Sequence, residues 1–130
     1  MMKRLTCTLA ALAMVMSAYI PAQAEFKGTL QRDQDWFIEI NSQSFDAIAV
    51  TVYYLGRNLE VVEIMTVPAV VTIQRNIPKP GRGVKRVVVE VDPPLNGRCT
   101  IRIVQGAETF LADFRSTHDG DSFRWVFDVE

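Results

Sequence analysis

The chain has 130 residues, and its 14 basic and 15 acidic side chains give a formal net charge of −1. This length allows one domain rather than two. The near-neutral charge argues against a nucleic-acid-binding protein, whose surface should be strongly basic. A domain of this size buries enough surface to fold without a structural metal or a disulfide.

The first 24 residues have the three parts of a secretory signal peptide. Lys3 and Arg4 form a short positive segment, and residues 5–20 are mostly apolar and uncharged. Ala22 and Ala24 then supply the small side chains of a peptidase cleavage site. The apolar stretch is shorter than the ~20 residues that a membrane-spanning helix needs, so we expect cleavage rather than a membrane anchor.

Cleavage after Ala24 predicts a mature domain, residues 25–130, that is periplasmic or secreted and has no membrane span. The leader holds two of the 14 basic residues, and 12 against 15 acidic residues leave a mature net charge of −3. Cys7 is lost with the leader and Cys99 remains alone. The mature chain therefore cannot form an internal disulfide.

The mature region shows period-two alternation of apolar side chains rather than helical spacing. Glycine, proline, asparagine and aspartate separate the alternating segments at intervals typical of sandwiches and barrels. Pro68 marks a strand end, because proline cannot donate to a strand ladder. In chain order, the predicted strands are residues 34–40, 45–55, 59–67, 69–75, 84–92, 98–103, 110–114 and 123–129.

The alternation also predicts which strand faces are buried. The clearest example is the segment 84–92, where Val87, Val89 and Val91 share one face. We therefore predict a single all-β domain, residues 25–130. Its expected fold is a two-sheet antiparallel β-sandwich of about seven to eight strands, immunoglobulin-like in architecture, with a small β-barrel as the alternative.

Four basic residues, Lys79, Arg82, Lys85 and Arg86, gather around one loop in a mature chain that is otherwise net acidic. A local positive patch can steer an anionic partner while the bulk charge repels others. We predict these residues as a binding surface for an acidic protein or for anionic envelope material. The alternative is an ordinary solvated loop.

Tyr53 is a fifth candidate binding residue. Its neighbours on one strand face, Ala49 and Thr51, are small, so its ring could lie exposed and offer a stacking surface. The other large aromatic side chains, among them Trp36 and Trp125, alternate with isoleucine and valine and are expected in the core.

Cys99 shares a strand face with Ile101 and Ile103, which predicts a buried core thiol. An intermolecular disulfide and a reactive nucleophile are the alternatives. His118, the only histidine, precedes two aspartates in a loop that ends at Ser122. A solvated turn is favoured there over a calcium loop, because the further ligand positions of such a loop are missing.

No nucleophile–base pattern, zinc-ligand spacing or nucleotide-binding motif stands out in the sequence. We therefore predict an exported, non-catalytic binding module of the bacterial cell envelope or periplasm. We expect no cofactor and no metal, and a protein or an anionic envelope component as the partner rather than a nucleic acid. The alternative is a small periplasmic enzyme that uses His118 with the neighbouring Asp119 or Asp121.

Overall fold

A computed structural model describes residues 23–44, 46–118 and 120–130 of the chain. The predicted leader up to Ala22 and the candidate Asp119 lie outside these described residues. The strands, in chain order, are β1 (Gln23–Leu30), β2 (Trp36–Ser42), β3 (Ile48–Leu55), β4 (Leu59–Val67), β5 (Thr72–Ile77), β6 (Arg86–Asp92), β7 (Arg98–Gln105), β8 (Glu108–Arg115) and β9 (Ser122–Val129).

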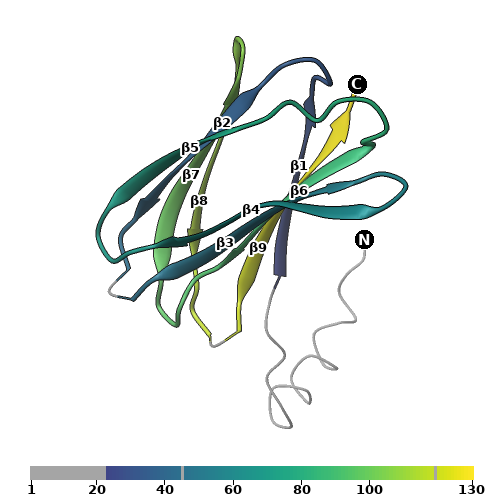
Figure 1. The fold of residues 1–130 in the computed structure, drawn as a ribbon. Helices are drawn as coiled ribbons and strands as arrows, with labels where there is room; N and C mark the ends of the chain where they lie inside the picture. The colour runs from purple at the N-terminus through teal and green to yellow at the C-terminus, as the bar shows by residue number, and fades with distance from the viewer. Residues whose placement is uncertain (1–22, 45, 119) are drawn as a thin grey trace, which may run out of the picture.

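The strands form two sheets that pack as two layers (Figure 1). One sheet has five strands in the order β1-β9-β6-β3-β4, and the other has four in the order β5-β2-β7-β8. Every pairing is antiparallel except that of β1 with β9, which is parallel. The predicted two-sheet β-sandwich is confirmed, and the sheets do not close into the alternative barrel. Within the described ranges, no helix is long and apolar enough to cross a membrane.

The strand faces follow the alternation in the sequence. In β2, Trp36, Ile38 and Ile40 point into the core, and in β6 the side chains of Val87 and Val89 are fully buried. The same pattern continues through β3, β7 and β9, which places one apolar face of each strand between the sheets. Burial of these faces is the main stabilising contribution to the fold.

β1 is the strand that the sequence pattern did not predict. Its inward positions are Ala24, Phe26, Gly28 and Leu30, so a glycine interrupts the apolar alternation. The glycine is required by packing, because a Cβ at Gly28 would lie 2.7 Å from the ring of Phe127. The glycine that interrupts the apolar alternation is therefore the position where an aromatic ring packs against the backbone.

The two open sides of the sandwich are closed differently. On the side of β1 and β8, aromatic rings fill the space: Phe26 packs edge-on against Trp125 at 5.5 Å, and Phe110 packs against Phe127 at 5.1 Å. On the side of β4 and β5, the ion pair between Glu63 and Arg75, at 4.0 Å, bridges the sheets. The first side is apolar and filled, whereas the second ends in exposed charge.

Candidate functional site

The connection between β5 and β6 carries most of the predicted binding residues, and we call residues 78–85 the basic loop. Its first residue is tied to the core through Tyr54, whose hydroxyl donates a hydrogen bond to the Pro78 carbonyl. The same hydroxyl accepts a hydrogen bond of 2.9 Å from Nε1 of Trp36. Burial raises the pKa of Tyr54 to about 12, so the hydroxyl remains a donor at neutral pH.

Arg32, from the turn after β1, holds the middle of the basic loop. Its Nη1 donates to the carbonyls of Gly81, at 2.8 Å, and Val84, at 2.7 Å, and the Gly81 amide donates back to the Arg32 carbonyl at 3.0 Å. At the end of the loop, the Lys85 amide donates to the Leu55 carbonyl at 2.8 Å. The backbone of the loop is thus fixed at its start, middle and end.

The charged side chains of the basic loop face solvent. Lys79, Arg82 and Lys85 are exposed, and none of them takes part in the ion pairs found among the described residues. The Lys79 backbone is fixed separately, because its amide donates to Oδ1 of Asp35 at 2.8 Å. These three charges therefore lie on an anchored backbone and form no ion pair within the described ranges, although the carboxylates of Asp33 and Asp35 lie close to the loop.

A hollow of about 520 Å³ lies beside Arg82 and Lys85. Its lining residues are Arg32, Asp33, Arg82, Gly83, Val84 and Lys85. Gly81 and Gly83 have φ angles of +77° and +91°, and the space at their Cβ positions is open. The loop therefore exposes backbone as well as cations, a combination suited to an anionic group.

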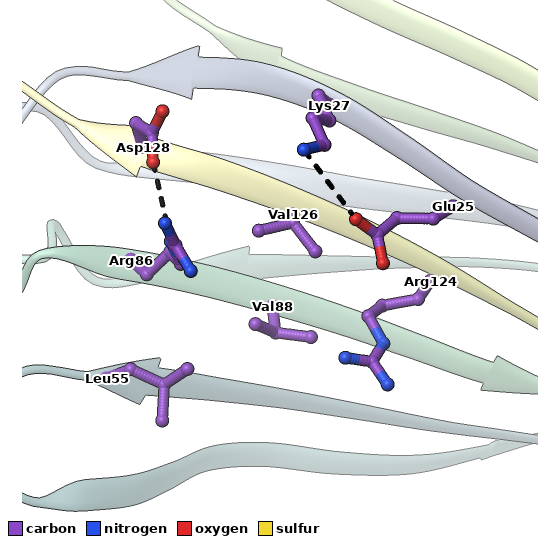
Figure 2. Close-up of a pocket in the computed structure, with 8 residues that line it drawn as sticks. All are labelled: Glu25, Lys27, Leu55, Arg86, Val88, Arg124, Val126 and Asp128. Carbon is purple, nitrogen blue, oxygen red and sulfur yellow. Dashed lines mark hydrogen bonds and ion pairs between the residues drawn. The ribbon is translucent and has the colours of Figure 1, made fainter.

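The fourth predicted basic residue, Arg86, lies on a different surface. It projects from β6 onto the outer face of the five-stranded sheet and pairs with Asp128 at 3.4 Å. Figure 2 shows it at the rim of a hollow of about 200 Å³, in which Val88 and Val126 lie between charged side chains. Because Glu25 and Lys27 also pair there, at 3.9 Å, the charges around this hollow largely compensate one another.

Tyr53 lies on the same outer face, where it pairs in register with Val88. Its ring is half-buried, so it is a less open platform than the small neighbours Ala49 and Thr51 suggested. Burial and the Glu90 carboxylate, with which the hydroxyl forms a hydrogen bond, raise the pKa of Tyr53. Tyr53 and Arg86 therefore belong to the sheet face, while Lys79, Arg82 and Lys85 belong to the basic loop.

The loop of His118 is organised around Asp121. Oδ2 of this carboxylate accepts hydrogen bonds from the amides of Thr117, at 3.1 Å, and His118, at 3.0 Å. The carboxylate is 5 % exposed, and Nδ1 of His118 lies 4.0 Å from it. Stabilisation of the turn accounts for Asp121. The hollows described above are lined by other residues.

Cys99 is fully buried, as its position in the alternation predicted. Burial, and secondly the carboxylate of Asp113, raises the pKa of the Cys99 thiol to about 11. A thiol with this pKa is almost entirely protonated at neutral pH, and the thiolate is the nucleophilic form. A core role is therefore favoured over the alternative of a reactive nucleophile.

The structure adds two residues that sequence reasoning did not select. Arg32 supports the basic loop from 49 and 52 positions away, and no local pattern marks it. Arg57, in the turn between β3 and β4, is exposed, and the neighbouring Gly56 approaches the carbonyl of Gly83. This close approach of two turns places the backbone next to Arg57 against the basic loop.

No family model matches the chain, and neither a curated protein nor a solved structure matches it. Within residues 23–44, 46–118 and 120–130, no group of three or more His, Cys, Asp or Glu side chains is placed to hold a metal ion.

Proposed function

We propose that the protein is an exported, non-catalytic binding module of the bacterial cell envelope or periplasm, which binds an anionic partner on the basic loop. The observation that supports this proposal is that the basic loop combines a fixed backbone with exposed cationic side chains. Hydrogen bonds from Tyr54, Arg32 and Lys85 fix its backbone, while the cationic side chains stay exposed. A preordered surface loses less conformational entropy on binding than a flexible one.

The charge distribution supports the same proposal. The expected mature chain has a net charge of −3, so a cluster of cations on one loop opposes the overall field of the protein. Such a local patch attracts an anionic partner and orients it during the encounter. Export is supported by the leader pattern of the first 24 residues.

The proposal is tested by charge reversal of the loop. The triple variant Lys79→Glu, Arg82→Glu and Lys85→Glu is compared with the unmodified protein for binding to poly-glutamate over a range of salt concentrations. Exposed charge contacts contribute about 0.5 kcal/mol each, so the three together should change the dissociation constant about tenfold. The variant should bind more weakly with a flatter salt dependence, and its melting temperature should not change.

A matched control separates a local effect from a change in total charge. Lys27, Arg98 and Arg115 are exposed cations that lie outside the basic loop, and their reversal to glutamate alters the net charge equally. We expect this control variant to keep most of the affinity for poly-glutamate. Equal losses in the two triple variants, or binding that survives reversal of the loop, would show that the basic loop is only a solvated connection.

A further inference from the structure

β4 forms one edge of the five-stranded sheet and pairs only with β3 (Figure 1). Three of its outward side chains are large and apolar: Leu59 is 61 %, Val61 49 % and Ile64 70 % exposed. They pair in register with Leu55, Tyr53 and Thr51 of β3, so they extend the outer face of the sheet to its edge. Apolar side chains of this size on an exposed sheet edge indicate an interaction surface.

Each of the other three edge strands carries a basic residue, whereas β4 has none. Proteins protect exposed edges with charged residues, lysine above all, and with proline. Within its nine residues, β4 has no lysine, arginine or proline. Of its two glutamates, Glu63 is paired with Arg75 and Glu60 is exposed, and a β-bulge interrupts the pairing of β4 with β3. The charged residues on the other edges are Glu25 and Lys27 in β1, Arg75 in β5, and Glu108, Asp113 and Arg115 in β8.

The exposed edge is continuous with the basic loop. Gly56, in the turn that leads into β4, packs so closely on the loop that a Cβ there would lie 2.1 Å from the carbonyl oxygen of Gly83. Next to it, the Lys85 amide donates to the Leu55 carbonyl at 2.8 Å. The Leu59 end of β4 therefore lies beside the cations of the basic loop, together with the exposed Arg57.

Charge complementarity decides which kind of partner fits this surface. A second copy of the chain that continued the sheet about a two-fold axis would pair antiparallel, β4 against β4. Its residues 65–73, which carry no charged side chain, would then lie beside the basic loop. An extended segment of another protein can instead offer apolar side chains to β4 and carboxylates to the loop.

We propose that β4 and the basic loop form one docking surface for such a protein segment. The partner adds an antiparallel strand to β4, its alternate apolar side chains cover Leu59, Val61 and Ile64, and the acidic residues that follow the strand reach the basic loop. In this mode, backbone hydrogen bonds supply affinity and the side chains supply specificity. The inference rests on the proposed function, since it assigns a chemical class of partner to the basic loop.

Three synthetic probes test the two parts of the surface separately. The first is an acetylated peptide of alternating valine and threonine followed by four aspartates. The second has the same strand followed by four lysines, and the third contains only the four aspartates. Fluorescence anisotropy with the full chain should show that the first peptide binds at least tenfold more tightly than either of the others. Hydrogen exchange of residues 59–67 should slow only with the first peptide.

The protein variants identify the edge that is used. The double variant Val61→Lys and Ile64→Lys should reduce the affinity for the strand–aspartate peptide to that of the tetra-aspartate. Leu111, on the edge strand β8, is 64 % exposed and serves as the matched control. Leu111→Lys should leave binding unchanged, and an N-methylated strand peptide, which lacks backbone donors, should bind no better than the tetra-aspartate.

Each failure has a distinct meaning. If the tetra-aspartate binds as tightly as the first peptide and exchange in β4 does not change, strand addition is wrong and the proposed function stands. If the lysine-tailed peptide binds as well as the aspartate-tailed one, the basic loop takes no part, and both proposals fail. If the protein alone self-associates and Ile64→Lys abolishes this, the edge belongs to a second copy, which overturns the partner proposed here.

Discussion

The hydroxyl of Tyr54 donates a hydrogen bond to the backbone carbonyl of Pro78, which connects the buried face of β3 to the start of the basic loop. Nε1 of Trp36, in β2, donates a hydrogen bond to the oxygen of the Tyr54 hydroxyl. A chain of hydrogen bonds thus runs from one sheet through the core to the surface that we propose as the binding site. The order of the loop therefore depends on a buried phenol.

Tyr54→Phe should weaken this connection without a large change in core volume. The substitution removes the donor to Pro78 and leaves Nε1 of Trp36 without its acceptor, so we expect a loss of about 1–3 kcal/mol in the free energy of unfolding. Backbone amides of residues 78–85 should also exchange faster. Urea unfolding and hydrogen exchange measure the two effects. Tyr53→Phe, on the outer face, is the control and should change the basic loop little.

The hydrogen bond from Tyr54 to Pro78 is a contact that the sequence pattern does not predict. The alternation along β3 places Tyr54 on one strand face with Val52 and Val50, and these three side chains are buried. It could not predict the hydrogen-bond partner of the phenol, which lies 24 positions away. The alternation of apolar residues predicts which side chains share one face of a strand. Which residues they contact across the core depends on the order of the strands in the two sheets.

Only part of the candidate site could be predicted from the sequence, because the rest depends on contacts between residues that lie far apart in the chain. Lys79, Arg82 and Lys85 are close in the chain and all lie exposed on the basic loop, where Arg82 and Lys85 line one hollow. Arg86 is adjacent in sequence, but the strand pairing places it opposite Asp128, 42 positions away, where its charge is compensated. Local clustering of charge in a sequence identifies an exposed patch only where the chain does not enter a sheet.

The register of the core strands makes a paired prediction. Val89 is fully buried between its neighbours in β6, so Val89→Asp places an unpaired charge in an apolar interior at a cost of several kcal/mol. This is comparable to the ~5–15 kcal/mol stability of a whole domain, and the variant should not fold.

Arg102→Ser is the matched variant on an outer face. It loses the pair with Glu39, at 3.1 Å, and the contact of the guanidinium with the Phe37 ring, at 5.4 Å. The arginine is partly exposed, so the loss should be about 1 kcal/mol. Thermal melts and soluble yield measure both variants. A folded Val89→Asp protein would contradict the register of β6.

The expected leader cleavage makes a prediction about β1. Removal of the chain up to Ala24 takes away two of the eight residues of this strand, and Phe26, which packs on Phe123 at 5.1 Å, remains. We expect the exported protein to begin at Glu25 and to keep the parallel pairing with β9. Intact mass of the protein recovered from the cell envelope measures this, and a retained leader in that fraction would refute it.

The burial of Cys99 predicts slow modification by thiol reagents. The thiol is fully buried and its pKa is raised to about 11, so little thiolate forms at neutral pH and access requires opening of the fold. Labelling should therefore accelerate with urea in parallel with unfolding. Labelling of the native protein at the rate of a free thiol, or a covalent dimer without reductant, would be inconsistent with a core role.

The same thiol should make the fold sensitive to alkali. Its pKa rises from 9.0 to about 11 on folding, so the folded state holds the proton more tightly than the unfolded chain. The corresponding stability is fully present below pH 9 and is lost as the pH rises towards 11, in total about 3 kcal/mol.

Cys99→Ala should start from a lower stability because a side chain is truncated, but it should lose less between pH 9 and pH 11. Titration of Tyr54 affects both proteins equally and cancels in the comparison. Urea midpoints at pH 8, 9, 10 and 11 measure the difference, and parallel curves for the two proteins would mean that Cys99 is not desolvated in the native state.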